Sequence, residues 1–198
     1  MTSDRRAGPF ELHVEPPEGD GELLVLVHGG WTDTTTWARL VPSLTRSFAV
    51  VRYDRRGHSR SPRGLLPPTR RQHEDDLAAL LERFDRGPAH LAGTSYGGAI
   101  ALGLAGRRPD LVRSVVAHEP VVDPIAPGVA ALFASVAAQI AAGDAAAATR
   151  RFFEVVILGP GGWGSVPEPV RRAAIGNART FADMLADPAW AALDAAAV

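Results

Sequence analysis

One short segment carries the residues that could do nucleophilic chemistry. Residues 93–98 read Gly-Thr-Ser-Tyr-Gly-Gly, which places Ser95 in the spacing Gly-x-Ser-x-Gly. The stretch 89–94 before the serine predicts a short buried strand, and 99–105 predicts a helix. A serine in a sharp turn between a strand and a helix has its hydroxyl exposed for attack on an acyl carbon. The alternative is an ordinary glycine-rich turn without chemistry.

A serine nucleophile needs a base to take its proton, and the sequence offers few candidates. His118 is the last histidine of the chain, and it stands beside Glu119 after a predicted strand. Neighbouring residues at a strand end point in opposite directions, so His118 and Glu119 should not face Ser95 together. The simpler interpretation is that His118, Glu119 and Pro120 shape the end of the strand, and that the base is missing.

Other polar residues follow two further predicted strands. His28 precedes a glycine pair after the apolar run 23–27, and we expect it to bond to loop backbone rather than to act as a base. Asp54, Arg56 and His58 follow the next strand. We expect these three side chains to fix their loop by hydrogen bonds rather than to contact substrate.

Two segments resemble binding motifs but have simpler explanations. Glu74, Asp75 and Asp76 lie early in a predicted helix, where acidic side chains interact favourably with the helix dipole, so no metal site is expected. Residues 159–164 are rich in glycine but lack the Gly-Lys-Ser/Thr ending of a phosphate loop. Trp163, inside this segment, either lines a pocket or anchors the helical region around it.

The elements around these residues alternate between strands and helices. We expect a half-exposed edge strand at 10–14, buried strands at 23–27 and 89–94, and further strands at 48–53 and 112–117. Helical spacing of apolar residues occurs at 34–46 and 69–84. This alternation predicts an α/β fold with a mostly parallel sheet and helices on both faces. After Pro124 the chain becomes alanine-rich and helical, although 155–158 is ambiguous.

Composition limits the function classes. The chain has 198 residues, a net charge of −1, no lysine and no cysteine, so disulfides, thiolate metal sites and a basic surface for nucleic acid are not expected. Residues 1–9 lack the apolar core of a secretory signal, and the longest apolar stretch, 129–142, is too short to span a bilayer. A cytoplasmic protein that binds a small molecule, without membrane or nucleic-acid partners, is the expectation.

Four motifs in order resemble the α/β-hydrolase fold superfamily. They are the segments His28–Trp31, Tyr53–Ser59, Gly93–Gly98 and His118–Pro120. The first two are similar to the branch that contains esterases, lactonases and cofactor-free haloperoxidases. The resemblance runs from about Phe10 to the end of the chain and covers roughly three quarters of a typical family domain.

This resemblance assigns roles to individual residues. It implies that Ser95 is the nucleophile and forms an acyl-enzyme that water hydrolyses. It also implies an oxyanion hole made by the backbone N–H groups of Tyr96 and Gly30, with Trp31 as the competing choice for the second donor. Neither a metal nor a cofactor is implied.

The resemblance also divides the chain. Residues 1–125 would form the N-terminal part of the hydrolase core, 126–187 a helical lid, and 188–198 the start of a C-terminal core segment. The family's acid and histidine would lie beyond Val198, together with C-terminal strands that this chain would lack. The strand at 112–117 would then be an open apolar edge, which predicts poor solubility or self-association.

These observations leave two function classes. The first is a serine hydrolase that cleaves a small ester, lactone or amide through Ser95, with perhydrolysis or carbon–carbon bond hydrolysis as variants on the same elbow. The second is a catalytically incomplete or non-catalytic hydrolase-like module, because no histidine follows His118. The substrate itself is not indicated by the sequence.

Overall fold

The centre of the molecule is a four-stranded parallel sheet. In the computed structural model, which describes residues 11–194, the strands run in the order β2-β1-β3-β4. They are β1 (Glu22–Val27), β2 (Phe48–Arg52), β3 (Ala89–Thr94) and β4 (Val112–His118). All three pairings are parallel, so the carboxyl ends of the strands meet at one edge of the sheet. The predicted α/β fold with a parallel sheet is confirmed.

The predicted edge strand at 10–14 is wrong in its described part. Phe10 lies outside the described residues, and 11–17 forms no strand. Instead, Val14 makes an isolated antiparallel bridge to Tyr53, and Glu18 makes another to Val50. Pro16 and Pro17 explain the difference, because proline has no N–H for a strand ladder. This segment therefore contacts the edge of β2 at two points only.

Two helices pack on one face of the sheet. They are α2 (Arg70–Phe84) and α3 (Tyr96–Arg107), and the buried core between them and the sheet contains Val25, Leu77 and Leu104. A capping box at Thr69 starts α2, because its hydroxyl accepts from the N–H of Gln72 and the Gln72 side chain accepts from the N–H of Thr69.

The opposite face is only partly covered. The single helix predicted at 34–46 is wrong: the chain forms two short turns, η1 (Thr34–Trp37) and α1 (Val41–Leu44). Three consecutive threonines at 34–36 favour helix weakly, and Pro42 starts the second turn. Beside these turns an apolar groove of about 590 Å³ runs over the sheet, between Trp37 and Leu40 on one side and Val116 on the other. Strand β4 forms the outer edge of the sheet among the described residues.

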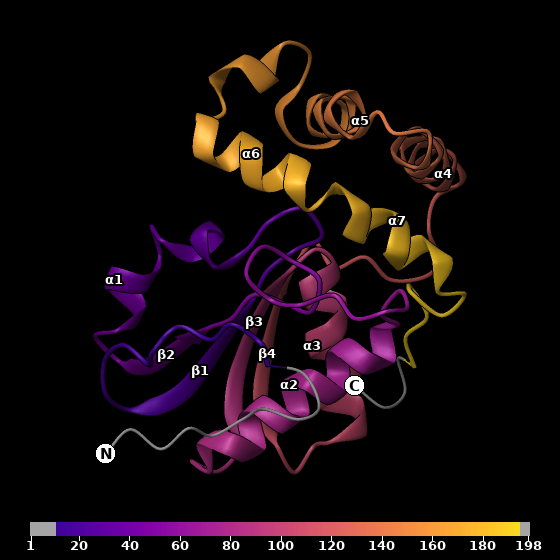
Figure 1. Cartoon of the computed structure of the whole chain (residues 1–198). Helices are drawn as coiled ribbons and strands as arrows, with labels where there is room; N and C mark the ends of the chain where they lie inside the picture. Colours follow the sequence, from indigo (N-terminus) through magenta and orange to yellow (C-terminus); the bar gives the residue numbers. More distant parts are fainter. Residues whose placement is uncertain (1–10, 195–198) are drawn as a thin grey trace.

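A helical layer lies over the carboxyl ends of the strands (Figure 1). It consists of α4 (Pro127–Ala141), α5 (Ala145–Phe152), η2 (Phe153–Leu158), η3 (Gly162–Ser165), α6 (Glu168–Gly176) and α7 (Ala178–Ala186). The ambiguous segment 155–158 is part of η2, which is a π-helix. No helix within residues 11–194 has the length and apolar character needed to cross a membrane.

Candidate active site

Ser95 occupies a strained turn between β3 and α3. Its φ is 53° and its ψ is −125°, in a region that side-chain-bearing residues rarely adopt. The Ser95 N–H donates to the carbonyl of His118 on β4 (2.9 Å), and the Ser95 carbonyl accepts from the N–H of Gly98 (2.9 Å). These backbone bonds hold the strained residue in place, as strained sites in functional regions require.

The two glycines of the motif are required by close backbone approach. A Cβ on Gly93 would lie 2.5 Å from the carbonyl oxygen of Gly97. A Cβ on Gly97 would lie 2.3 Å from the carbonyl oxygen of Val27 and 2.4 Å from that of His28. Side chains at either position would push the strand, the turn and the helix apart. The spacing Gly-x-Ser-x-Gly therefore reflects the packing of β3, α3 and the end of β1.

The predicted site residues come together around one small cavity. Ser95 and Tyr96 line it from the elbow, and Gly30 and Trp31 line it from the loop after β1. Its volume is about 20 Å³, which holds about one water molecule. The remaining lining is apolar and comes from the segment after β4 and from the helical layer: Val121, Phe133, Phe152, Phe181 and Met184.

Aromatic rings close this cavity from above. Trp31 stacks on Phe181 of α7 with ring centroids 4.8 Å apart, and it packs on Phe152 of α5 at 4.9 Å. Phe133 of α4 contacts Phe181 edge to face at 5.2 Å. All four rings are buried. The helical layer thus covers Ser95 with apolar aromatic groups.

The loop that carries Gly30 is held from below by hydrogen bonds to its carbonyl groups. The Gly29 oxygen accepts from His28 Nδ1 and from a guanidinium nitrogen of Arg55, both at 2.9 Å. The Gly30 oxygen accepts from the hydroxyl of Thr180 at 3.0 Å. As expected, His28 bonds to loop backbone and does not contact Ser95.

Three histidines are buried beside Arg55. Burial lowers the pKa of His28, His58 and His73 well below the usual value, and the Arg55 charge lowers each further. All three imidazoles are therefore neutral at pH 7. Burial also lowers the pKa of Arg55 to about 10, so its guanidinium remains charged at neutral pH.

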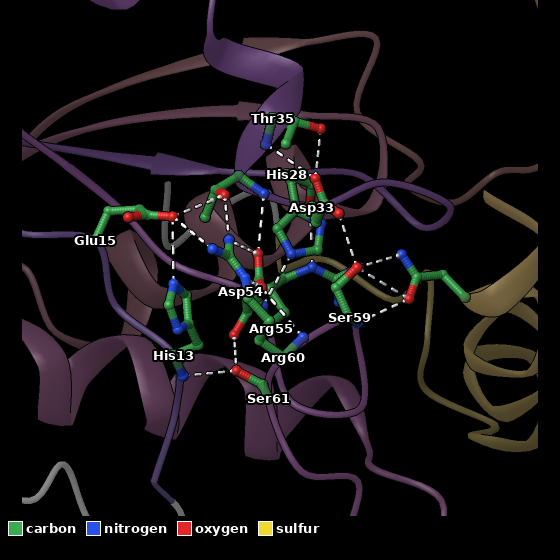
Figure 2. A network of polar contacts seen from close by, with 12 residues as sticks. His13, Glu15, His28, Asp33, Thr35, Asp54, Arg55, Ser59, Arg60 and Ser61 are labelled. Carbon is green, nitrogen blue, oxygen red and sulfur yellow. Dashed lines mark hydrogen bonds and ion pairs between the residues drawn. The ribbon is translucent and has the colours of Figure 1, made fainter. Parts of the chain in front are cut away.

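Asp54 ties the loop after β2 to the loop after β1 (Figure 2). Its fully buried carboxylate accepts from the N–H of Thr34 at 3.0 Å and from Arg60 Nε at 2.8 Å. The Asp54 carbonyl accepts from the hydroxyl of Ser61. The nearby Asp33 carboxylate caps η1 through the N–H of Thr35. The expectation that Asp54 fixes its loop is confirmed.

Arg56 and the acidic run on α2 form ion pairs between helices and loops. Arg56 holds Asp76 with two nitrogens, Glu74 contacts Arg107 of α3, and Asp75 contacts the same arginine. The acids lie in the second turn of α2, because the helix begins at Arg70. The expected dipole role is therefore wrong, and these carboxylates instead link α2 to its neighbours through arginine.

Helix α7 supplies site contacts that sequence reasoning missed. Asn177, just before α7, accepts from the N–H of Ser59 (2.8 Å) and donates to the carbonyl of Thr32 (3.3 Å). Thr180 bonds to Gly30, as described above, and Asp183 forms a two-nitrogen ion pair with Arg63. These contacts span more than 100 residues of sequence, so no local pattern could have indicated them.

None of the six histidines, all of which lie in the described range, hydrogen-bonds to the Ser95 hydroxyl. His118 is the nearest along the sheet, but its exposed side chain lines the apolar groove and not the cavity at Ser95. Glu119, with a φ of 47°, is exposed and forms no hydrogen bond to a histidine within residues 11–194. The structure thus brings Ser95, Tyr96 and Gly30 together without adding His118.

The sequence is similar to known hydrolases. A sequence profile described as alpha/beta hydrolase fold matches residues 22–159. An uncharacterized hydrolase, YraK, of Bacillus subtilis is 38% identical over 108 residues, which are 52% of this chain and 39% of the relative. The 2-(acetamidomethylene)succinate hydrolase of Mesorhizobium japonicum is 34% identical over 110 residues, which are 56% of this chain and 39% of the relative. The matched region thus spans well under half of these relatives.

Solved structures agree in fold. The enol-lactonase of Burkholderia xenovorans LB400 superposes with a TM-score of 0.77 at 23% identity, over 89% of this chain and 69% of that chain. A thermophilic esterase of Thermogutta terrifontis gives a TM-score of 0.74 at 23% identity, over 92% of this chain and 71% of that chain. With the profile covering most of the sequence, the chain belongs to the alpha/beta hydrolase fold family.

Proposed function

We propose that this chain carries the nucleophile and oxyanion hole of a serine hydrolase that cleaves a small ester, lactone or amide. The observation that carries the proposal is the strained conformation of Ser95, enforced by glycines whose Cβ atoms would collide with backbone. Such strain persists where the surrounding structure compensates for it, and it clusters at active sites. In the proposed reaction, Ser95 Oγ bonds to the acyl carbon, the leaving group departs, and water hydrolyses the acyl-enzyme.

The proposed oxyanion hole uses the backbone N–H groups of Tyr96 and Gly30. Both residues line the cavity next to Ser95, and neither N–H donates a hydrogen bond within the described part of the chain. Free N–H groups beside a nucleophile suit the negative oxygen of a tetrahedral intermediate. The loss of one such donor costs about 3 kcal/mol of transition-state stabilisation.

The proposed substrate is small and its acyl part is largely apolar. The cavity beside Ser95 is lined by aromatic rings, and its volume of about 20 Å³ is far below the roughly 300 Å³ or more of a ligand site. We infer that α4 or α5 moves to admit a substrate, so that residues 126–187 act as a lid. Similar proteins are named as an enol-lactonase, an esterase and a 2-(acetamidomethylene)succinate hydrolase, which supports hydrolysis of an acyl compound without indicating its polarity.

The second candidate is a hydrolase-like module without turnover. The observation that favours it is that no histidine among residues 11–194 contacts the Ser95 hydroxyl. Cytoplasmic location and self-association through β4 stay predictions that accompany either candidate. The exposed fraction of Val116 on β4, 67%, supports the self-association.

Turnover of a chromogenic ester separates the two candidates. The purified chain and its Ser95→Ala variant would be incubated with 4-nitrophenyl acetate, and 4-nitrophenolate release would be followed. The hydrolase proposal expects release that continues beyond one equivalent and is lost in the variant. A single equivalent that depends on Ser95 indicates an acylated, incomplete enzyme. Equal release by both proteins contradicts the nucleophilic role of Ser95.

A further inference from the structure

Arg55 is a buried cation that no carboxylate neutralises among the residues described. Its side chain is 1% exposed. The guanidinium donates to the carbonyl oxygens of His28 (3.0 Å) and Gly29 (2.9 Å) and to the ring nitrogen Nε2 of His58 (3.1 Å). It also lies 5.3 Å from the ring centre of Tyr96. A buried charge is costly unless it is paired or well hydrogen-bonded, so its position below the elbow needs an explanation.

The contact with Gly29 sets the direction of a neighbouring N–H. The carbonyl of Gly29 and the N–H of Gly30 belong to one planar trans peptide, in which they point in opposite directions. Arg55 and His28 both hold the Gly29 oxygen from below, on the side of β2. The N–H of Gly30 therefore points away from Arg55, and Gly30 lines the cavity that contains Ser95.

Arg55 also selects the tautomer of His28, which lies beside it in Figure 2. The backbone N–H of Arg55 donates to Nε2 of His28 at 2.8 Å, so this nitrogen carries no proton. The neutral imidazole must then carry its proton on Nδ1, which donates it to the Gly29 oxygen. The guanidinium of Arg55 thus donates directly to the Gly29 carbonyl, and the backbone N–H of Arg55 orients the second donor, His28 Nδ1.

We propose that Arg55 is a positioning residue for the oxyanion hole. Its guanidinium holds the carbonyl of the Gly29–Gly30 peptide, so the N–H of the same peptide points toward Ser95. The same contact strengthens this N–H as a hydrogen-bond donor. The inference rests on the proposed function. A charged donor on a peptide oxygen polarises the peptide, because hydrogen bonds in a chain strengthen one another. The positive charge below the elbow also favours the negative oxygen that develops above it.

The first test follows the Gly30 amide directly and needs no activity. The ¹⁵N and ¹H shifts of Gly30 would be measured in the wild type, in Arg55→Met and in Arg55→Lys. The matched control is Arg107→Met, because Arg107 bonds to Glu74 and Asp75 between α2 and α3 and lies outside the proposed site. We expect a large shift of Gly30 in Arg55→Met, a smaller one in Arg55→Lys, and none in the control. An unchanged Gly30 amide in Arg55→Met overturns the proposal.

The second test compares two phosphorylating probes, diethyl 4-nitrophenyl phosphate and its P=S counterpart. With each probe, Ser95 Oγ bonds to phosphorus, 4-nitrophenolate leaves, and the hydroxyl proton passes to solvent. An oxyanion hole favours the P=O probe, since oxygen accepts hydrogen bonds far better than sulfur. We expect Arg55→Met to slow labelling by the P=O probe about tenfold and to change labelling by the P=S probe little. The expected effect is smaller than the roughly 10²–10³-fold loss of rate that follows removal of a whole oxyanion-hole donor.

The outcomes separate the two proposals. If both probes slow equally in Arg55→Met, as a merely structural role predicts, the positioning role of Arg55 is wrong although Ser95 remains a nucleophile. If neither probe labels Ser95 in the folded wild type, the hydrolase proposal fails, and the Gly30 amide alone decides whether Arg55 orients the peptide. If Arg55→Met does not fold, Arg55→Lys, which keeps the charge with fewer donors, gives the same comparison with a smaller expected loss.

Discussion

The regions below and above Ser95 are built from different interactions. Below it, buried polar groups around Arg55 and Asp54 make directional hydrogen bonds, and each of them fits one arrangement of the loops. Above it, the rings of Trp31, Phe152 and Phe181 make stacked and tilted contacts that many arrangements could satisfy. The difference indicates that the lower region fixes the geometry of the reacting groups. Helix α7 is tied to this region by Thr180 and Asp183, so α4 and α5 are the helices expected to move for a substrate.

The largest expected effect comes from filling the space at the elbow. Gly97→Ala places a Cβ 2.3 Å from the carbonyl oxygen of Val27, and neither backbone can retreat without breaking the sheet. We expect a loss of at least about 4 kcal/mol in the free energy of unfolding, measured by urea denaturation. Gly176→Ala is the matched control, because nothing lies within 4 Å of its added Cβ. A Gly97→Ala variant as stable as this control would contradict the packing described for the elbow.

A smaller effect is expected from the buried carboxylate of the lower region. Asp54→Ala leaves the buried N–H of Thr34 without its acceptor and removes one of the two carboxylates that hold Arg60, which costs about 3 kcal/mol. Asp110→Ala, which removes an exposed partner of Arg108, should change the free energy of unfolding much less, because exposed ion pairs contribute little. Thermal and urea unfolding of both variants would measure the difference. Equal losses would show that the lower network does not depend on Asp54.

The pH dependence of stability tests the neutral histidines. His28, His58 and His73 have a folded-state pKa below the unfolded value of 6.5, so the unfolded state binds more protons as the pH falls through that value. The stability is fully present above about pH 6.5 and is lost as the pH falls toward the folded-state pKa values. We expect a loss of about 2 kcal/mol between about pH 7.5 and pH 6.

Urea denaturation at several pH values would check this sign and window. Glu15 and Asp33 do not contribute in the same range, because their pKa values are lowered from values that already lie near 4. Burial raises the pKa of Asp76, which favours stability at the lower pH and so opposes the effect of the histidines. His90→Gln serves as the control, because His90 is a partly exposed histidine that bonds to Ser114 and Glu22. A stability that is flat from pH 7.5 to pH 6 would show that the buried histidines are not held neutral.

The smallest effect on stability is expected in the aromatic layer. Phe181→Leu keeps an apolar side chain beside Trp31 and should cost about 1 kcal/mol in the free energy of unfolding. The same change widens the cavity beside Ser95. The rate of labelling by a bulky phosphonate should therefore rise relative to the rate of labelling by a small phosphonate. Intact mass spectrometry over time would give both rates. An unchanged ratio would show that Phe181 does not limit access to Ser95.

Local patterns predicted the lower region better than the upper one. The apolar run before His28 and the spacing around Ser95 indicate strands and an elbow, because both depend on residues close together in sequence. The bonds from Asn177 and Thr180 to the loops after β1 and β2 were not predictable, since they join residues more than 100 positions apart. The break between η1 and α1, at residues 38–40, was missed because apolar spacing alone favoured one helix.

Covalent labelling shows whether Ser95 is an activated nucleophile. The folded chain would be treated with a fluorophosphonate, its intact mass recorded, and the modified peptide sequenced, with Ser95→Ala treated in parallel. The account predicts one added phosphonyl group, located on Ser95 and absent from the variant. A folded protein that gains no mass, or gains it equally in Ser95→Ala, would contradict the account.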